Sequence, residues 1–182
     1  DLAGGTGDIA LGFLNRGGGK ATIADLNFQM LSVGKQKNNS LSVNNDLSWL
    51  ACNGENLPFN DNNFDIVSIS FGLRNITHKS IALNEIFRVL KPGGRFMCLE
   101  FSKVNISILN LFYQIWSSRV IPTLGERISG QKDNYEYLIE SIKRFPDQDE
   151  LSSMIYNSNF VSVKYRNLSG GIAAIHLSLI HI

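Results

Sequence analysis

The chain has 182 residues, 43% of them hydrophobic and 18% charged, which is the composition of a globular domain large enough to bury a core. Its 17 basic and 16 acidic side chains form no long block of either sign, and the formal charge of +1 argues against a nucleic-acid-binding face. The three histidines lack the spacing of metal ligands. We expect the two cysteines, Cys52 and Cys98, to be buried, reduced thiols, with a disulfide between them as the open alternative.

A glycine-rich turn opens the chain, with the sequence Asp1-Leu-Ala-Gly-Gly-Thr-Gly-Asp8. Glycines let the backbone turn sharply and come close to a ligand, where a Cβ would obstruct it. The apolar residues that follow, between positions 9 and 14, predict a helix whose free N–H groups face the turn. A turn of this kind needs a buried parallel strand in front of it. Only residues 1–3 precede the glycines, so we expect most of the first strand to be missing.

The next apolar segment, residues 21–24, predicts a strand that ends at Asp25. In α/β nucleotide sites, a carboxylate about 20 residues after the glycine turn holds the ribose hydroxyls. The opening of the chain therefore predicts a cofactor loop. This pattern alone does not choose the cofactor, because Gly5-x-Gly7-x-x-Ala10 also satisfies the dinucleotide fingerprint, and a nicotinamide-dependent oxidoreductase stays open as an alternative.

Strand and helix patterns alternate along most of the remaining chain, which favours a sheet covered by helices on both faces. Near the end, Gly170-Gly171 separates two apolar segments and predicts a hairpin. With the truncated first strand counted, we expect an α/β fold with a seven-stranded sheet of mixed direction. Further strands are predicted at residues 47–52, 64–70, 95–101, 161–165 and 172–175, and helices at residues 81–90 and from residue 28 to the polar stretch 34–40.

Residues 105–144 form a long insertion for a compact domain, with apolar and aromatic side chains on a roughly helical period. The segment is too short and too interrupted to span a bilayer. One interpretation is a helix that packs on the core. The other is a lid or membrane-facing wall for an apolar substrate.

Three motifs lie further along the chain: Asn53-Gly-Glu-Asn-Leu-Pro-Phe59, Asp61-Asn-Asn-Phe-Asp65 and Leu90-Lys-Pro-Gly-Gly94. They resemble the later motifs of S-adenosylmethionine-dependent methyltransferases, whose fold also ends in a hairpin. Four more motifs are Ser70-Phe-Gly-Leu-Arg-Asn75, Leu99-Glu-Phe-Ser102, Tyr135-x-Tyr-Leu-x-Glu-Ser-Ile142 and Phe145-Pro-Asp-Gln148. They give a closer resemblance, to the ubiquinone/menaquinone biosynthesis C-methyltransferase family, which runs in order from Asp1 to about His176.

The resemblance implies a Rossmann-like class I methyltransferase fold, with residues 1–176 as one domain that contains the insertion 105–144. Residues 177–182 do not resemble the family, and we interpret them as a non-native or divergent tail. The loop 34–45 is short and rich in Asn and Ser, and His78 stands where an acidic residue is common in the family.

The resemblance also implies the reaction. The enzyme would transfer the methyl group of S-adenosylmethionine to a ring carbon of a polyprenylated benzoquinol or naphthoquinol, without a metal. Its substrate would keep it at a membrane surface, at the inner membrane of a bacterium or on the matrix side in a mitochondrion, where it could pair with other quinone-pathway enzymes or with itself. An O- or N-methyltransferase for another small molecule and a non-catalytic protein that binds a partner are the remaining alternatives.

The family motifs assign roles to individual residues. Thr6, with the backbone of Gly5 and Gly7, would hold the methionine part of the cofactor. Asp25 would accept hydrogen bonds from both ribose hydroxyls. A plain structural role is open for each side chain, with Thr6 as a helix cap and Asp25 as a turn residue.

Two further places complete the predicted cofactor site. Asn53-Gly54 would lie at the adenine. Ser70, at the carboxyl end of its strand, would line the pocket near the acceptor, where open α/β sheets place their ligands. The alternative for Ser70 is a polar strand end without a ligand.

Arg74 is the predicted catalytic residue. Methylation of a quinol ring carbon needs an electron-rich ring, which loss of a phenolic proton supplies. A guanidinium stays protonated and cannot be the base, but it can stabilise the phenolate and position a water. The alternative is a structural arginine that binds loop carbonyls. Asn75, His78 and Tyr135 are weaker candidates for orienting the ring.

Overall fold

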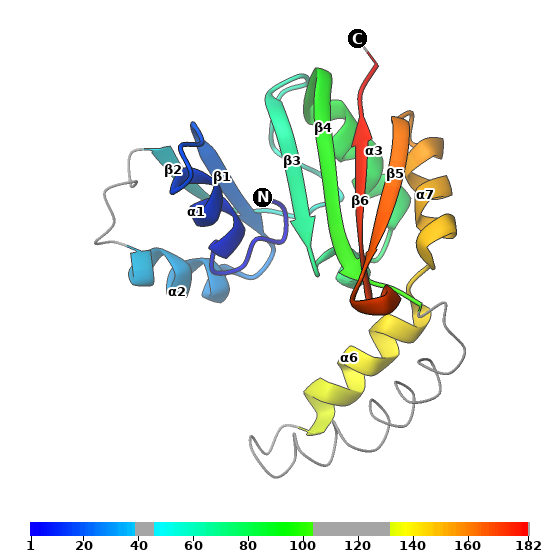
Figure 1. The fold of residues 1–182 in the computed structure, drawn as a ribbon. Coiled ribbons are helices and arrows are strands. Elements are labelled where there is room, and N and C mark those ends of the chain that lie inside the picture. Colours follow the sequence, from blue (N-terminus) through cyan, green and yellow to red (C-terminus); the bar gives the residue numbers. More distant parts are fainter. Residues whose placement is uncertain (39–45, 104–131, 182) are drawn as a thin grey trace.

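The computed structural model describes residues 1–38, 46–103 and 132–181, and it contains a mixed β-sheet with helices packed against it (Figure 1). The α/β prediction is confirmed. The strands in the described residues are β1 (Ala21–Asp25), β2 (Leu47–Ala51), β3 (Phe64–Ser70), β4 (Leu90–Phe101), β5 (Val161–Leu168) and β6 (Ala173–Leu179).

The strands fall into two hydrogen-bonded groups. β1 pairs with β2 in parallel, and the second group has the order β3-β4-β6-β5. β4 is parallel to β3 but antiparallel to β6, and β6 is antiparallel to β5. The terminal hairpin is therefore the antiparallel part of the sheet, as predicted, with a short 3-10 turn at Ser169–Gly171 between its strands.

Leu2 joins the two groups. It forms parallel bridges to Ala24 of β1 and to Ile69 of β3, its N–H donates to the Ser68 carbonyl at 2.8 Å, and the Ala24 N–H donates to the Asp1 carbonyl at 2.9 Å. Residues 1–3 thus occupy the place of a strand between β1 and β3. The described residues contain six strands and this short bridge, so the expected count of seven stays a prediction.

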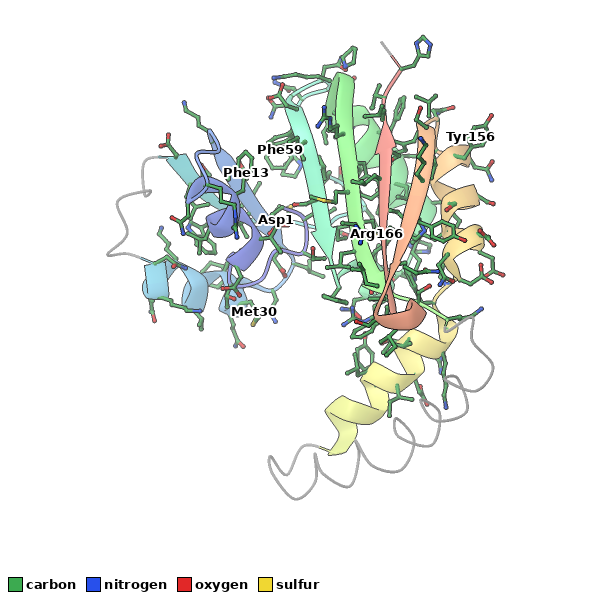
Figure 2. The ribbon with its side chains drawn as sticks, in the orientation of Figure 1. Asp1, Phe13, Met30, Phe59, Tyr156 and Arg166 are labelled. Atoms are coloured by element: carbon green, nitrogen blue, oxygen red, sulfur yellow. The ribbon has the colours of Figure 1, made fainter. Side chains whose placement is uncertain are left out.

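A cavity of about 320 Å³ lies between β1 and β3, on the amino-terminal side of Leu2. Its lining is mostly apolar and comes from both strands, from the first helix and from the turn before β3 (Figure 2 shows Asp1, Phe13 and Phe59 around it).

Five α-helices accompany the strands in the described residues: α1 (Asp8–Leu14), α2 (Phe28–Asn38), α3 (Lys79–Val89), α6 (Lys132–Arg144) and α7 (Gln148–Asn157). α3 buries Ala82, Leu83, Ile86 and Val89, the spacing of one helical face. α7 begins with a capping box, in which Asp147 accepts backbone N–H groups and Glu150 reaches back to the Asp147 N–H.

Several predicted boundaries differ from the structure by one to five residues, and β5 continues to Leu168 where its prediction ends at residue 165. α2 continues through the polar stretch to Asn38, whose amide donates to the Gly34 carbonyl at 2.8 Å. β4 begins at Leu90 instead of residue 95. β6 continues to Leu179, and residues 177–179 pair with β4, so the sheet extends past residue 176, where we placed the end of the domain. The insertion is described only from residue 132, where α6 begins; the rest of it lies outside the described residues.

Candidate functional site

The glycine-rich loop is held to the end of β1 by the Asp25 carboxylate. One carboxylate oxygen accepts the Gly5 N–H at 2.8 Å, and the other accepts the Asn27 N–H at 2.7 Å. The half-buried Asp25 therefore lies directly beside the loop, as predicted, at the carboxyl edge of the sheet. The two backbone bonds fix the orientation of its carboxyl group before any ligand binds.

The loop needs glycine at particular positions. Gly5 and Gly7 have φ values of +54° and +85°, which L-residues with a side chain rarely adopt. A Cβ at Gly7 would lie 2.4 Å from Ile23 Cδ1, so the backbone there packs directly on β1. The Thr6 hydroxyl donates to the Asp8 carboxylate at 2.9 Å, and α1 has no side-chain cap, so the helix-cap interpretation of Thr6 is wrong.

The turn after β2 also lies beside Asp25, at the carboxyl edge of the sheet. The Cys52 N–H donates to the Asp25 carbonyl at 3.0 Å, which brings the ends of the two strands together. Asn53 accepts the Glu55 N–H through its side chain and forms a tight turn, and Gly54 is buried in that turn. A Cβ at Gly54 would lie within 3.1 to 3.6 Å of Ile76 and Leu2 side-chain atoms.

Ser70 ends β3 and is half-buried. The next residue, Phe71, has a φ of +54°, and its N–H donates to the Leu99 carbonyl of β4 at 2.8 Å. A Cβ on Gly72 would lie 2.4 Å from the Cβ of Ala3, so the turn after Ser70 packs against the start of the glycine-rich loop. The structure thus brings all the predicted cofactor residues to one edge of the sheet.

Arg74 lies in the 3-10 turn η2 (Leu73–Asn75), which follows Ser70. Its guanidinium forms an ion pair with Glu100 of β4 at 3.1 Å and donates to the Phe71 carbonyl, and its backbone N–H donates to the same carboxylate at 3.1 Å. The Arg74 and Glu100 side chains are 11% and 1% exposed. These contacts are those of the structural-arginine interpretation, and the catalytic role stays a prediction.

Sequence reasoning missed Glu100. Burial raises the pKa of its carboxyl group, and the Arg74 guanidinium acts in the opposite direction. The guanidinium also lies 5.2 Å from the ring centroid of Phe101. Glu100 stands in the motif that carries the family resemblance, and a charged residue inside an apolar strand is the signal that could have identified it.

A second cavity, of about 230 Å³, lies between η2 and α6. We call it the η2–α6 cavity. Arg74, Asn75 and Lys79 line it from one side, and the Tyr137 hydroxyl of α6 donates to the Asn75 side-chain oxygen at 3.3 Å. His78 is exposed and pairs with Glu55 at 2.8 Å, outside this lining. The side chain of Tyr135 lies outside the described residues.

Two further findings concern the same described part of the chain. It holds no group of three His, Cys, Asp or Glu side chains placed to bind a metal ion. Both cysteines are free: Cys98 is buried and Cys52 is half-buried.

Comparison with known proteins identifies the family. The model of the ubiE/COQ5 methyltransferase family matches residues 1–180. The chain belongs to this family. The ubiquinone/menaquinone biosynthesis C-methyltransferase UbiE of Bartonella quintana (strain Toulouse) is 51% identical over 178 residues, and that of Brucella abortus (strain S19) is 48% identical. Both comparisons cover 97% of this chain, which spans 68% and 66% of the two relatives.

Solved structures agree on the fold of this family member. The YcgJ protein of Bacillus subtilis matches the whole chain with a TM-score of 0.71 at 17% identity, covering 91% of that protein. A SAM-dependent methyltransferase from Aquifex aeolicus matches 99% of the chain, and 80% of its own length, with a TM-score of 0.69 at 16% identity. The predicted methyltransferase class and its S-adenosylmethionine cofactor are thereby confirmed at the level of the family, and a nicotinamide-dependent oxidoreductase is not favoured.

Proposed function

We propose that the chain is part of an S-adenosylmethionine-dependent C-methyltransferase that acts on a ring carbon of a polyprenylated benzoquinol or naphthoquinol in ubiquinone or menaquinone biosynthesis. The observation that carries the proposal is the convergence of the glycine-rich loop, Asp25, Gly54 and Ser70 at one edge of the sheet. The names of the Bartonella and Brucella relatives support the pathway.

The residues at this edge fit the cofactor. Gly5 and Gly7 leave a backbone without side chains beside a fixed carboxylate, which suits a ligand that carries a ribose and an amino-acid chain. Asp25 would accept the ribose hydroxyls, Thr6 and the loop backbone would hold the methionine part, and Asn53 would contact the adenine. When bound, S-adenosylmethionine supplies an activated methyl group, so catalysis depends on placing and ionising the acceptor.

The acceptor would lie on the Ser70 side of this edge. Arg74 fixes the turn after Ser70 through the Phe71 carbonyl and Glu100, and it lines the η2–α6 cavity. Its Nε is buried and has no hydrogen-bond partner among the described residues. Because Arg74 also lines the η2–α6 cavity, its outer guanidinium N–H groups would contact an acceptor oxygen there.

A membrane surface is the proposed setting, because a polyprenylated substrate resides there. Leu26 and Phe28, which follow β1 near the cofactor loop, are 75% and 70% exposed and would suit contact with lipid. Among the described residues, every helix falls short of the length and hydropathy that a bilayer span requires. We propose the inner membrane of a bacterium, or the matrix side of a mitochondrial one, with other quinone-pathway enzymes or a second copy as partners.

Methyl transfer tests the proposal directly. The chain is incubated with isotopically labelled S-adenosylmethionine and a demethylated prenyl quinol, and mass spectrometry locates the transferred methyl group. We expect a ring-carbon methyl that Asp25→Ala abolishes. Asp65→Ala is the matched control, because Asp65 pairs with Lys91 at the opposite, amino-terminal end of β3. A methyl on oxygen or nitrogen would favour the alternative methyltransferases, and cofactor binding without transfer would refute the quinol substrate.

A further inference from the structure

We propose that the η2–α6 cavity binds the phenolic oxygen of the acceptor and that the Lys79 ammonium stabilises this oxygen as the phenolate. The inference rests on the proposed function and deepens it, since it names the group that ionises the ring. Its support is the distribution of charge around the cavity, which leaves one cation without a carboxylate partner in the described part of the chain.

The positive charge of Arg74 is balanced by a carboxylate inside the protein. Its guanidinium lies 3.1 Å from the buried Glu100 carboxylate, and that carboxylate also accepts the Arg74 and Phe101 backbone N–H groups. A buried pair of this kind presents little net charge to a ligand. Arg74 can still donate a hydrogen bond to an acceptor, but another group must supply the positive field.

Arg144, on the α6 side of the cavity, is also paired. Its guanidinium lies 3.0 Å from Glu140, one turn earlier in the same helix, and both side chains are largely exposed. An exposed pair of this type is screened by water and exerts a weak field on the cavity. Two of the three cations that line the cavity are thus balanced by neighbouring carboxylates.

Lys79 is the third cation. Its ammonium donates to the Ile76 carbonyl at 2.9 Å and lies 5.9 Å from the ring centroid of Phe145, and no carboxylate of the described residues is within 4 Å. One of its three N–H donors is used by this carbonyl, so the others can reach a ligand. Burial lowers the pKa of Lys79, with Glu100 and Glu55 opposing the shift, so an added anion would favour the charged form.

A cation at this place would assist the chemistry. In the ionisation step the phenolic O–H bond breaks, the proton passes to a solvent water, and the electron pair stays on the oxygen and delocalises onto the ring carbon that is methylated. A positive charge beside the oxygen favours the phenolate, and it acts more strongly in a partly buried cavity than in bulk water. The cavity adjoins Arg74, whose turn follows Ser70, so an oxygen held there keeps the ring near the predicted cofactor site.

A phenol that cannot be methylated as a substrate tests the cavity without relying on catalysis. Para-nitrophenol changes its absorption spectrum when it ionises, so titration with and without the chain measures the pKa of the bound probe. We expect the chain to lower this pKa, Lys79→Met to weaken phenolate binding by about tenfold or more, and Lys79→Arg to restore most of it. Lys91→Met is the matched control, because Lys91 is exposed and pairs with Asp65.

Kinetics of methyl transfer provide the second measurement. Lys79→Met should leave S-adenosylmethionine binding unchanged and move the acidic limb of the pH–rate profile to higher pH, since the acceptor then ionises with its unassisted pKa. The other charged or titratable groups around Lys79 are Glu55, Glu100 and Arg74, and from α6 Tyr137, Glu140 and Arg144. None of them is altered in this variant.

The outcomes separate the two proposals. A probe pKa that the chain leaves unchanged, or a Lys79→Met variant that lowers it as much as the parent does, would overturn the Lys79 inference. A lowered probe pKa that depends on Lys79, together with no transfer to any quinol, would refute the proposed function but keep the phenolate site.

Discussion

Gly7→Ala should destabilise the chain much more than Gly17→Ala, although both glycines have a φ of +85°. The surroundings of the two glycines differ. A Cβ at Gly7 would lie 2.4 Å from Ile23 Cδ1 and 2.9 Å from Trp49 Cη2, whereas a Cβ at Gly17 would have nothing within 4 Å. The pair therefore separates backbone strain from overpacking.

The magnitudes follow from these two terms. An L-residue in the left-handed region costs about 1–2 kcal/mol, which both variants share. Forcing a methyl group into a packed core adds about 1–3 kcal/mol, and only Gly7→Ala incurs it. Ile23 is fully buried, so it has little room to move away. We expect a loss of about 2–5 kcal/mol for Gly7→Ala, from the sum of the two ranges, and about 1–2 kcal/mol for Gly17→Ala.

Urea unfolding monitored by far-ultraviolet circular dichroism measures both losses as differences in the free energy of unfolding. Equal losses in the two variants would refute the reasoning, because they would mean that the glycine-rich loop does not pack on Ile23 as described. A loss confined to cofactor binding, with unchanged stability in Gly7→Ala, would refute it as well.

Three further predictions concern buried charge and a helix cap. Arg74→Met leaves the Glu100 carboxylate buried without its partner and should cost about 3–5 kcal/mol at neutral pH. Burial already raises the pKa of Glu100 above its ordinary value of 4.5, so the folded state binds more protons and stability falls as the pH rises through that region. The loss in Arg74→Met should therefore shrink on acidification, and a loss independent of pH in urea titrations would contradict this. Burial lowers the pKa of His176 from 6.5, so the folded state binds fewer protons than the unfolded state and stability is lost as the pH falls below that value. The melting temperature of His176→Phe should therefore lack the decrease with falling pH that this group causes, and an unchanged decrease would contradict the prediction. Asp147→Ala removes the cap of α7 and should lower the unfolding free energy by about 1 kcal/mol in urea, whereas an unchanged value would show that the capping box contributes nothing.

Local pattern predicted the strands well where a continuous apolar run is bounded by turns. The prediction of residues 64–70 matches β3 at both ends. It placed the start of β4 too late, because Lys91-Pro-Gly-Gly94 is typical of a helix end and does not show that the chain already pairs there. Leu90 lies opposite Phe64, and the Gly93 N–H donates to the Ile180 carbonyl. Such pairing between distant segments is invisible to local pattern.

The candidate cofactor site was predictable because strand ends and glycine turns have a fixed place in α/β sheets. Asp25 lies beside the loop for this reason. The sequence could not show that two backbone N–H groups already occupy the Asp25 oxygens, since these bonds depend on how the loop folds. Nor could it show that Gly54 and Gly72 are needed for packing against Leu2 and Ala3.

The need of Glu100 for a buried partner could have been inferred from alternation along β4, although the identity of that partner could not. Phe96, Cys98 and Glu100 occupy every second position and are 1%, 0% and 1% exposed, so Glu100 points to the same buried face as its two apolar neighbours. A carboxylate on such a face needs a cation or several N–H donors, and Arg74 supplies both through its guanidinium and its backbone. The arginine that the family motif presents as catalytic is therefore also required to hold the turn after Ser70, and loss of activity in an Arg74 variant would by itself not distinguish the two roles. Lys79, which has no such carboxylate partner in the described residues, is the position at which charge near the proposed acceptor site can be changed without removing a buried ion pair.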